Sequence, residues 1–437
     1  MKQQDRIQLT IMAIGLSVLL IVRDVLGIEL SKYIYLAYVV TFLAVAQYKT
    51  MVYMVCFILP LVCGLPGTYI MPCALALLIF KKKHVNIWQI GMLLFVTCAE
   101  ILASFWYPTL KIPNMVQYIS FAGVMFYLIH DKTELDHLQC VKMYMLGVSL
   151  LCAVIITTGV MNAPSGWQDL FIKGWFRFGE TQMDELEGMK LTLNANSLAY
   201  YSVTGMCCGA LLVEKVKGKD RILYLVLVFV SFAAGILTVS RSWLLILAIC
   251  LFLYILSKAK YPKRFLAMAA VLALMLFAAS WVVGSADEFI TAFTTRLNDE
   301  NMESGGERTE LFAAYTTAFF NNIRVTLLGS GVTQYVDVLN MKQSMHNGTQ
   351  QIVVCYGLLG FAVMLAALLK PIVGIRAKGK KDMICWLPLI GIILFVQTIQ
   401  FLEPTMLMLP YIVGVFALKA GGTNDEKVHH NGRYRGR

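Results

Sequence analysis

The chain has 437 residues, of which 58% are hydrophobic and only 14% are charged, and its formal net charge is +11. About a quarter of the residues in ordinary soluble domains are charged. Because a soluble surface of this size must carry such charge, the composition excludes a soluble globular fold. The excess of Lys and Arg needs no nucleic-acid partner, since basic residues accumulate in the cytoplasmic loops of membrane proteins.

Apolar runs of spanning length begin at the N-terminus and recur along the chain. The first run follows a charged start, and no small-residue cleavage site comes after it, so we expect a transmembrane helix and not a removed signal peptide. The sequence predicts an all-α polytopic membrane protein with about 12–14 transmembrane helices. The expected spans are 7–22, 30–47, 51–63, 68–80, 87–106, 115–130, 140–160, 195–213, 222–239, 242–257, 265–283, 350–370, 383–399 and 404–418.

The third and fourth of these spans form one apolar stretch, 51–80, that is interrupted by helix-breaking residues. Each half is short for a full crossing of a bilayer. Two tight helices and a broken, re-entrant pair packed inside the bundle both fit this pattern. The interruptions are Pro60, Gly64, Pro66, Gly67 and Pro72.

The distribution of Lys and Arg indicates the orientation in the membrane. If the N-terminus is cytoplasmic, most of the 37 basic residues fall in cytoplasmic segments, as the positive-inside rule requires. We therefore expect both termini in the cytoplasm, with residues 1–425 as one membrane domain and 426–437 as a basic cytoplasmic tail. The eleven Cys residues lie within or beside apolar segments, so we expect neither a disulfide framework nor a Cys-based metal site.

This topology leaves two long polar segments outside, 161–194 and 284–349. The second, between the spans at 265–283 and 350–370, is the longest loop, and long ordered loops commonly carry function. Within it Leu311, Tyr315 and Phe319 recur at helical spacing, together with Phe312. We expect short amphipathic helices there, one of them lying at the outer membrane surface.

The outer segments also carry short polar motifs. Ser240, Arg241 and Ser242 form a tight turn between two spans, and Arg308 stands early in the long loop. Gly329-Ser330-Gly331 follows, and His346-Asn347 lies directly before the span at 350–370. Arg177 in the first outer segment precedes Gly188. Of the six His residues, His346 alone is expected on the outer side.

In order and position these motifs resemble those of the O-antigen ligase and O-antigen polymerase family of bacterial membrane glycosyltransferases. The resemblance covers residues 190–370, while the first 160 residues match only as apolar helices. It implies a multi-pass protein of the bacterial cytoplasmic membrane, which takes a glycan from undecaprenyl pyrophosphate at the outer face. It also implies that neither a cofactor nor a metal ion is needed. The spacing of Arg177 and Gly188 resembles one found in some polymerases of this class.

The resemblance implies catalytic roles for Arg308 and His346. Arginine keeps its charge and matches phosphate oxygens with a planar fork, and histidine exchanges protons near neutral pH. Pyrophosphate or substrate binding is assigned to Arg241, Arg177, Asn347 and Ser240. Structural roles remain open: Arg308 opposite a neighbouring glutamate, His346 as a helix cap, and Arg241 in an ion pair. Glu100, an acid within a span, is equally a functional candidate and a hydrogen-bonding group of the bundle.

We therefore expect a polymerase that joins lipid-linked oligosaccharide repeat units of an O-antigen, capsular polysaccharide or exopolysaccharide. The expected partners are the undecaprenyl-pyrophosphate-linked donor, the glycan acceptor and the bilayer, together with flippase and chain-length regulator proteins, and no nucleic acid. The first alternative is a ligase that moves the finished glycan to lipid A core or to a protein. The second is a polysaccharide transporter or flippase, which should show paired charges near the midplane of the membrane.

Overall fold

The computed structural model describes residues 3–82, 84–106, 112–162, 175–176, 178, 185–186, 189–190, 193–258, 306–376, 382–402 and 407–421. Helices make up nearly all of the described elements, which confirms the all-α fold. They are α1 (Gln3–Leu20), continued by a π-helical segment (Ile21–Val25), α2 (Lys32–Val45), α3 (Tyr48–Ile58), continued by a 3-10 segment (Leu59–Gly64), α4 (Gly67–Lys81), α5 (Ile87–Trp106), α6 (Ile112–Ile129), α7 (His137–Asn162), α9 (Ala195–Lys215), α10 (Lys219–Leu237), α11 (Arg241–Lys258), α14 (Gly306–Asn321), α15 (Ile323–Leu328), α16 (Tyr335–Val338), α17 (Gly348–Arg376), α18 (Met383–Val396) and α19 (Tyr411–Ala420).

Six described helices are long and apolar enough to cross a membrane. They are Gln3–Val25, Ile87–Phe105, Ile112–Ile129, His137–Met161, Lys219–Leu237 and Gly348–Ile375. Six shorter apolar helices accompany them. Every expected span within the described residues contains a helix, while the span at 265–283 lies outside them. The last helix begins later than expected, at Tyr411, because residues 407–410 form turns that end at Pro410.

The interrupted stretch 51–80 forms two helices inside the bundle. The side chains of α3 are buried from Thr50 to Ile58, and Pro60 begins the 3-10 segment that follows. α7 passes so close that a Cβ atom at Gly147 would collide with the carbonyl oxygen of Phe57. α3 is therefore buried on all sides, and protein covers the irregular backbone at its end. Within a membrane such backbone must be shielded from lipid, because lipid cannot satisfy its polar groups.

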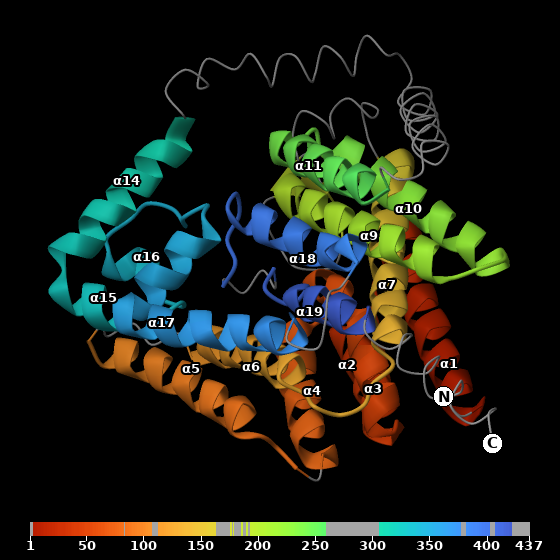
Figure 1. Cartoon of the computed structure of the whole chain (residues 1–437), viewed down its shortest axis with the longest axis horizontal. Helices are drawn as coiled ribbons and strands as arrows, with labels where there is room; N and C mark the ends of the chain where they lie inside the picture. The colour runs from red at the N-terminus through yellow and green to blue at the C-terminus, as the bar shows by residue number, and fades with distance from the viewer. Residues whose placement is uncertain are drawn as a thin grey trace, which may run out of the picture.

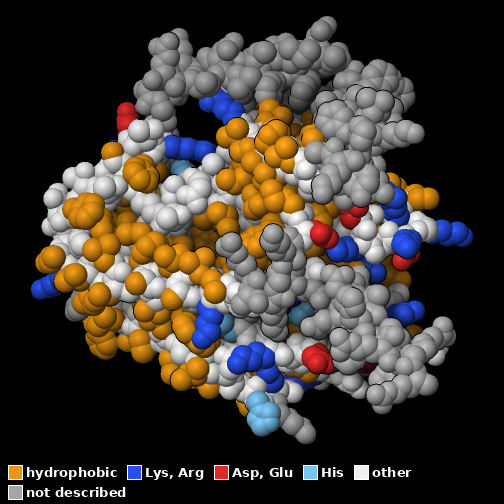
Figure 2. Space-filling view, in the orientation of Figure 1, with side chains coloured by type: hydrophobic (Ala, Val, Ile, Leu, Met, Phe, Trp, Pro, Cys, Tyr) orange, Lys and Arg blue, Asp and Glu red, His pale blue; other side chains and the backbone are white. Residues whose placement is uncertain are grey.

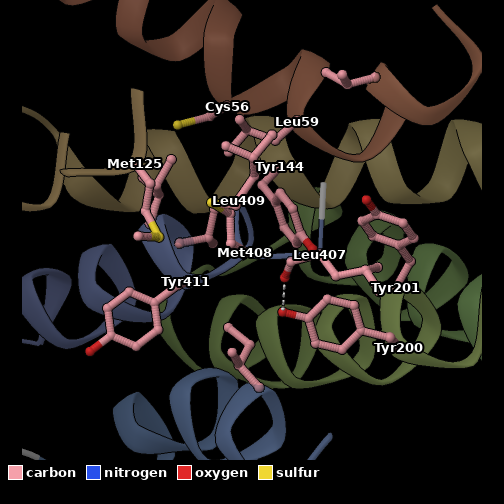
Figure 3. Packing of buried hydrophobic residues seen from close by; sticks show 14 of the residues in the cluster. Cys56, Leu59, Met125, Tyr144, Tyr200, Tyr201, Leu407, Met408, Leu409 and Tyr411 are labelled. Carbon is pink, nitrogen blue, oxygen red and sulfur yellow. Dashed lines mark hydrogen bonds between the residues drawn. The ribbon is translucent and has the colours of Figure 1, made fainter. Parts of the chain in front are cut away.

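Large aromatic residues fill the core between α7, α9 and α19, as Figure 3 shows. The hydroxyl groups of Tyr200, Tyr144 and Tyr411 find partners within the bundle, whereas the buried Tyr201 hydroxyl has none among the described residues. The Tyr200 hydroxyl donates to the carbonyl oxygen of Leu407 at 2.9 Å, and the hydroxyls of Tyr144 and Thr204 lie 2.8 Å apart. The paired hydroxyls therefore avoid the cost of an unsatisfied polar group in an apolar interior. All eleven cysteines are free thiols, so the expectation of no disulfide framework is confirmed.

The long loop between the spans at 265–283 and 350–370 contains helices, as expected. α14, α15 and α16 gather at one end of the bundle, and α1 begins at the opposite end (Figure 1). Tyr315 and Phe319 turn inward from α14 and are almost fully buried, whereas Phe320 and Ile323 are exposed. The helical periodicity in this segment was therefore read correctly, although its position relative to the membrane surface stays a prediction.

The Gly329-Ser330-Gly331 segment packs directly on the backbone of α17. The amide of Ser330 donates to the Val354 carbonyl at 3.1 Å, and that of Gly331 donates to the Cys355 carbonyl at 3.0 Å. Gly329 and Gly357 both have positive φ angles, and a Cβ atom on either would collide with the backbone of the other segment. Glycine is required at both positions because two main chains meet there. The same contact kinks α17 at Gly357.

The polar segment 161–194 contains two short antiparallel ribbons that the sequence did not suggest. β1 (Trp175–Phe176) pairs with β4 (Leu193–Asn194), and β2 (Glu185–Leu186) pairs with β3 (Met189–Lys190). Strands of two residues carry too little periodicity to be read from sequence. The Asn194 side chain accepts from the amide of Asn196 at 2.8 Å and thereby caps α9.

Candidate functional site

A polar cavity of about 290 Å³ opens between α14, the start of α17 and the end of α18. Arg308, in the first turn of α14, is exposed at its rim, and the half-buried His346 and Asn347 come from the turn before α17. The structure thus brings together three predicted site residues that come from two separate segments of the loop. The full lining consists of Arg308, Thr309, Phe312, His346, Asn347, Gln350, Gln397 and Thr398.

Asn347 caps α17 and fixes the turn that carries His346. Its side-chain oxygen accepts from the amide of Gln350 at 2.9 Å, and its side-chain nitrogen donates to the carbonyl of Gln397 at 3.2 Å. A capping side chain at this position satisfies an amide that would otherwise lack a partner at the start of the helix. The orientation of His346 therefore depends on contacts with both α17 and α18.

Two glutamines that the site prediction missed close the cavity. Gln350 donates through its side-chain nitrogen to the Phe312 carbonyl at 2.8 Å and to the Thr316 hydroxyl at 3.0 Å, which ties α17 to α14. The Gln397 side chain exchanges hydrogen bonds of 3.0 and 3.1 Å with Thr349. Gln350 was within reach of sequence reasoning, since it lies one helical turn after His346. Gln397 gave no local signal because it belongs to a different span.

Ser240 and Arg241 begin α11. The Ser240 hydroxyl is buried, donates to the side-chain oxygen of Asn196 at 3.1 Å and accepts from the amide of Trp243 at 3.4 Å. Ser240 thus caps α11 and positions its neighbour, and Arg241 itself is exposed. Val239 adopts a positive φ of 45°, which is unusual for a β-branched residue and marks a constrained turn at this point.

The positive charges of Arg308 and Arg241 act on each other. Burial by neighbouring protein and the charge of Arg241 together lower the pKa of Arg308, although arginine remains protonated at physiological pH. Two like charges held in proximity repel, so this arrangement favours an anion between them. Figure 2 shows basic side chains and a His side chain in the hollow beside α14. The planar guanidinium groups of the two arginines suit a phosphate or pyrophosphate group as the bound anion.

Arg177 lies outside the described residues, so its predicted role stays a prediction. The described part of the chain contains no group of three or more His, Cys, Asp or Glu residues arranged to hold a metal ion.

Glu100 connects the long loop to the helical bundle through hydrogen bonds. Its carboxylate, buried in α5, accepts from the amides of Val332 and Thr333 at 2.6 and 3.3 Å and from the Thr333 hydroxyl at 2.8 Å. These contacts follow directly after the Gly-Ser-Gly segment. Of the two roles left open by the sequence, the structure supports the hydrogen-bonding one, with partners 232 residues away along the chain.

We expect Glu100→Ala to lower the apparent melting temperature of the purified protein, because it leaves two buried amides without an acceptor. Each such loss costs about 1–3 kcal/mol. Glu100→Gln keeps one acceptor oxygen and should fall between wild type and Glu100→Ala. Thermal unfolding in detergent measures the effect, with Glu310→Ala, on the exposed face of α14, as the control. Equal melting temperatures for Glu100→Ala and wild type would contradict the anchoring role.

Fold and site together define an integral membrane protein whose bundle carries a basic, amide-lined cavity under a helical loop. The family model described as O-antigen ligase matches residues 226–365, a region that contains Ser240, Arg241, Arg308, His346 and Asn347. This match supports membership of the O-antigen ligase family and confirms the resemblance read from the motifs. Glu100 and Gln397 lie outside the matched region. A comparison with curated proteins found no match.

Proposed function

We propose that this protein is a polymerase of lipid-linked oligosaccharide repeat units, which transfers a glycan from undecaprenyl pyrophosphate to a hydroxyl of an acceptor sugar. Membership of the O-antigen ligase family supports an activity of the ligase or polymerase type in general. The observation that carries the proposal is the convergence of Arg308, His346 and Asn347 on one cavity, with the charge of Arg241 acting on Arg308.

In this proposal Arg308 and Arg241 bind the pyrophosphate of the donor. Negative charge builds on the pyrophosphate as the bond from its oxygen to the anomeric carbon breaks, and the leaving group keeps the electron pair. Fixed positive charges at that point stabilise the transition state more than the ground state. The mutual repulsion of the two guanidinium groups is relieved when the anion binds, which favours the loaded site.

His346 then acts as the general base. The acceptor hydroxyl oxygen forms the new bond to the anomeric carbon, and its proton passes to the imidazole of His346. This assignment is supported by the position of His346 in the wall of the same cavity as Arg308. Geometry within reach of the reacting hydroxyl and a pKa range near working pH are the two requirements for such a base.

The remaining lining suits a sugar. Asn347, Gln350, Gln397, Thr309 and Thr398 offer uncharged amide and hydroxyl groups, and Phe312 adds an aromatic ring that is about half exposed. Uncharged donors and acceptors match the hydroxyl pattern of a glycan without competing with the pyrophosphate for the arginines. We assign these residues to the acceptor glycan.

The proposal places the α14–α16 end at the outer face of the bacterial cytoplasmic membrane, with both termini in the cytoplasm. The excess of basic residues in the segments at the other end supports this orientation. The donor would then be reached in the outer leaflet, with its lipid chain against the exposed apolar side chains of the bundle. Flippase and chain-length regulator proteins are the proposed partners in the membrane.

Gene deletion separates the polymerase from the ligase. A lost polymerase leaves single repeat units attached to the acceptor, whereas a lost ligase leaves full-length chains on undecaprenyl pyrophosphate. We expect the first pattern on a gel of the host polysaccharide, restored by the wild-type gene. The second pattern would replace the polymerase assignment with a ligase. Absence of any lipid-linked glycan at the outer face would indicate a flippase and overturn both.

A further inference from the structure

A second cavity, of about 450 Å³, lies among the helix ends on the side of the bundle away from α14–α16. Its walls come from the start of α3, the segment between α4 and α5, and the turn after α6. None of the residues that line it is acidic, and three are lysines. The lining consists of Tyr48, Lys81, Lys82, His84, Val85, Asn86, Lys132 and Thr133.

α17 runs from the first cavity to the neighbourhood of the second, so its length gives the approximate distance between them. At one end of α17, Gln350 lines the candidate glycan site. Toward the other end, the ammonium group of Lys370 lies 3.9 Å from the centre of the Trp88 ring, two residues after Asn86 of the second cavity. Twenty residues of a straight helix rise about 30 Å, which is the thickness of the hydrocarbon core of a bilayer, and the kink at Gly357 makes this an upper limit for the stretch from Gln350 to Lys370. If one cavity lies at one membrane interface, the second therefore lies at the opposite interface.

Asp131, beside the second cavity, already has hydrogen-bond partners. Asp131 accepts from the Lys82 ammonium at 2.5 Å, from the Tyr48 hydroxyl at 2.5 Å and from the Thr133 amide at 2.8 Å. Burial alone would raise the pKa of Asp131, but these hydrogen bonds outweigh burial and lower it, so the carboxylate stays ionised. Asp131 thus neutralises Lys82, and the other basic residues of the lining are Lys81, Lys132 and His84.

Two of those residues are available to a ligand. Lys132 and His84 form no hydrogen bond or ion pair within the part of the chain that the structure describes. The Lys81 ammonium donates to the carbonyls of Leu43, Ala44 and Ala46 at the end of α2, which uses all three of its N–H groups and leaves its positive charge in place. The cavity therefore combines one ordered ammonium group with two side chains that are open to a partner.

The surroundings are positive as well. Burial and the charges of Lys419 and Lys370 lower the pKa of His130, one residue before Asp131, to about 4. The Lys419 ammonium donates to the carbonyls of Ile129 and Asp131 at 3.3 and 3.2 Å. An anion in the cavity would thus gain from charges beyond the residues that touch it.

Apolar side chains flank the basic cavity. Phe80, next to Lys81, is 84% exposed, and Ile87, next to Asn86, is 81% exposed. In Figure 2 basic side chains and a His side chain lie among hydrophobic ones along the lower edge of the molecule. Adjacent basic and apolar surfaces match a molecule that carries an anionic head and a hydrocarbon chain.

We propose that this second cavity binds the phosphate group of an anionic lipid headgroup, in the leaflet opposite the candidate glycan site. Lys132 and His84 contact the phosphate oxygens, the fixed charge of Lys81 attracts the anion, and Phe80 and Ile87 contact the acyl chains. The chemistry recognised is a phosphate ester, and the apolar rim selects its membrane-bound form over a soluble one. The assignment is independent of the reaction proposed for the other cavity.

Native mass spectrometry of the full-length protein in detergent tests this site with phosphatidylglycerol and phosphatidylcholine. We expect the wild type to prefer phosphatidylglycerol, and Lys132→Ala to weaken its binding about fivefold, the contribution of one basic residue at a membrane surface. Lys132→Arg keeps the charge and should bind as the wild type does. Lys217→Ala, an exposed lysine between α9 and α10, is the control and should change nothing.

A third arm adds inorganic phosphate and soluble glycerol phosphate as competitors. If either displaces phosphatidylglycerol at concentrations similar to those of the lipid, the ligand is a soluble phosphate and the lipid assignment is overturned. If the wild type binds both lipids equally, the cavity does not select an anionic headgroup, and if Lys132→Ala and Lys217→Ala behave alike, Lys132 does not contact the phosphate. Either result overturns the proposal. Because Lys132 is exposed, we expect its variants to fold as the wild type does, and elution as a single species checks this.

Discussion

Arg308→Ala is expected to lower the rate of glycan transfer about 100- to 1,000-fold, the usual cost of removing one group that stabilises transition-state charge. Arg308 stands at the rim of the cavity that contains His346, and it shares an electrostatic environment with Arg241. Its loss leaves one guanidinium group to hold a doubly charged leaving group. The measurement is the rate of chain extension in isolated membranes that contain equal amounts of each variant.

Two further variants make this prediction specific. Arg308→Lys keeps the positive charge but loses the planar fork, so we expect an activity between those of the wild type and Arg308→Ala. Arg324→Ala removes an exposed arginine of α15, outside the cavity, and should leave transfer unchanged. If Arg308→Ala and Arg324→Ala have the same activity, Arg308 does not bind the leaving group.

His346→Ala is expected to have the second large effect, about 100- to 10,000-fold, which is the range for removal of a general base. The base works only when its imidazole is neutral. The wild-type rate should therefore fall as the pH drops through the pKa of that imidazole, and this acidic limb should be missing from the residual activity of His346→Ala. A pH–rate profile of chain extension, with matched protein levels, measures both effects.

The control for His346→Ala is His84→Ala, at the opposite end of the bundle. His84→Ala should keep the wild-type pH profile. If the acidic limb persists in His346→Ala, another group takes the proton. In that case the position of His346 serves the packing of the turn that Asn347 caps, and its catalytic assignment is wrong.

The bundle was largely predictable from the sequence because a membrane helix must be both long and apolar. The expected spans and the helical periodicity of Tyr315 and Phe319 therefore agree with the structure. We could predict that Arg308, His346 and Asn347 belong to one site only because the order of their motifs resembles that of a known family. No local feature of the sequence indicated it. Composition and spacing alone would have placed each of them on a solvated loop.

What the sequence could not predict were contacts between distant segments. Gln397 reaches the cavity from α18, and Glu100 reaches the Gly-Ser-Gly segment from α5. Each partner is one of many polar residues near a helix end, and only tertiary packing selects it. The close approach of Gly329 to Gly357 likewise depends on two backbones meeting, which neither glycine reveals by itself.

These contacts indicate different roles for the region that matches the family model and for the residues outside it. The region that matches the family contains the basic groups and His346. Residues outside it hold that region in place: Glu100 through the loop after Gly331, and Gln397 through Thr349 and Asn347. Substitutions at Glu100 should therefore change stability first, and substitutions at Arg308 should change catalysis without a comparable loss of stability.

The most direct test of the account uses right-side-out membrane vesicles and a water-soluble, short-chain donor that cannot cross the bilayer. Supplied from outside, together with an acceptor glycan, the donor should yield an extended glycan and free short-chain pyrophosphate. Vesicles that contain Arg308→Ala should yield neither above background. Product formed only after the vesicles are opened would place the site on the cytoplasmic side, and no product in either case would contradict glycosyl transfer by this protein.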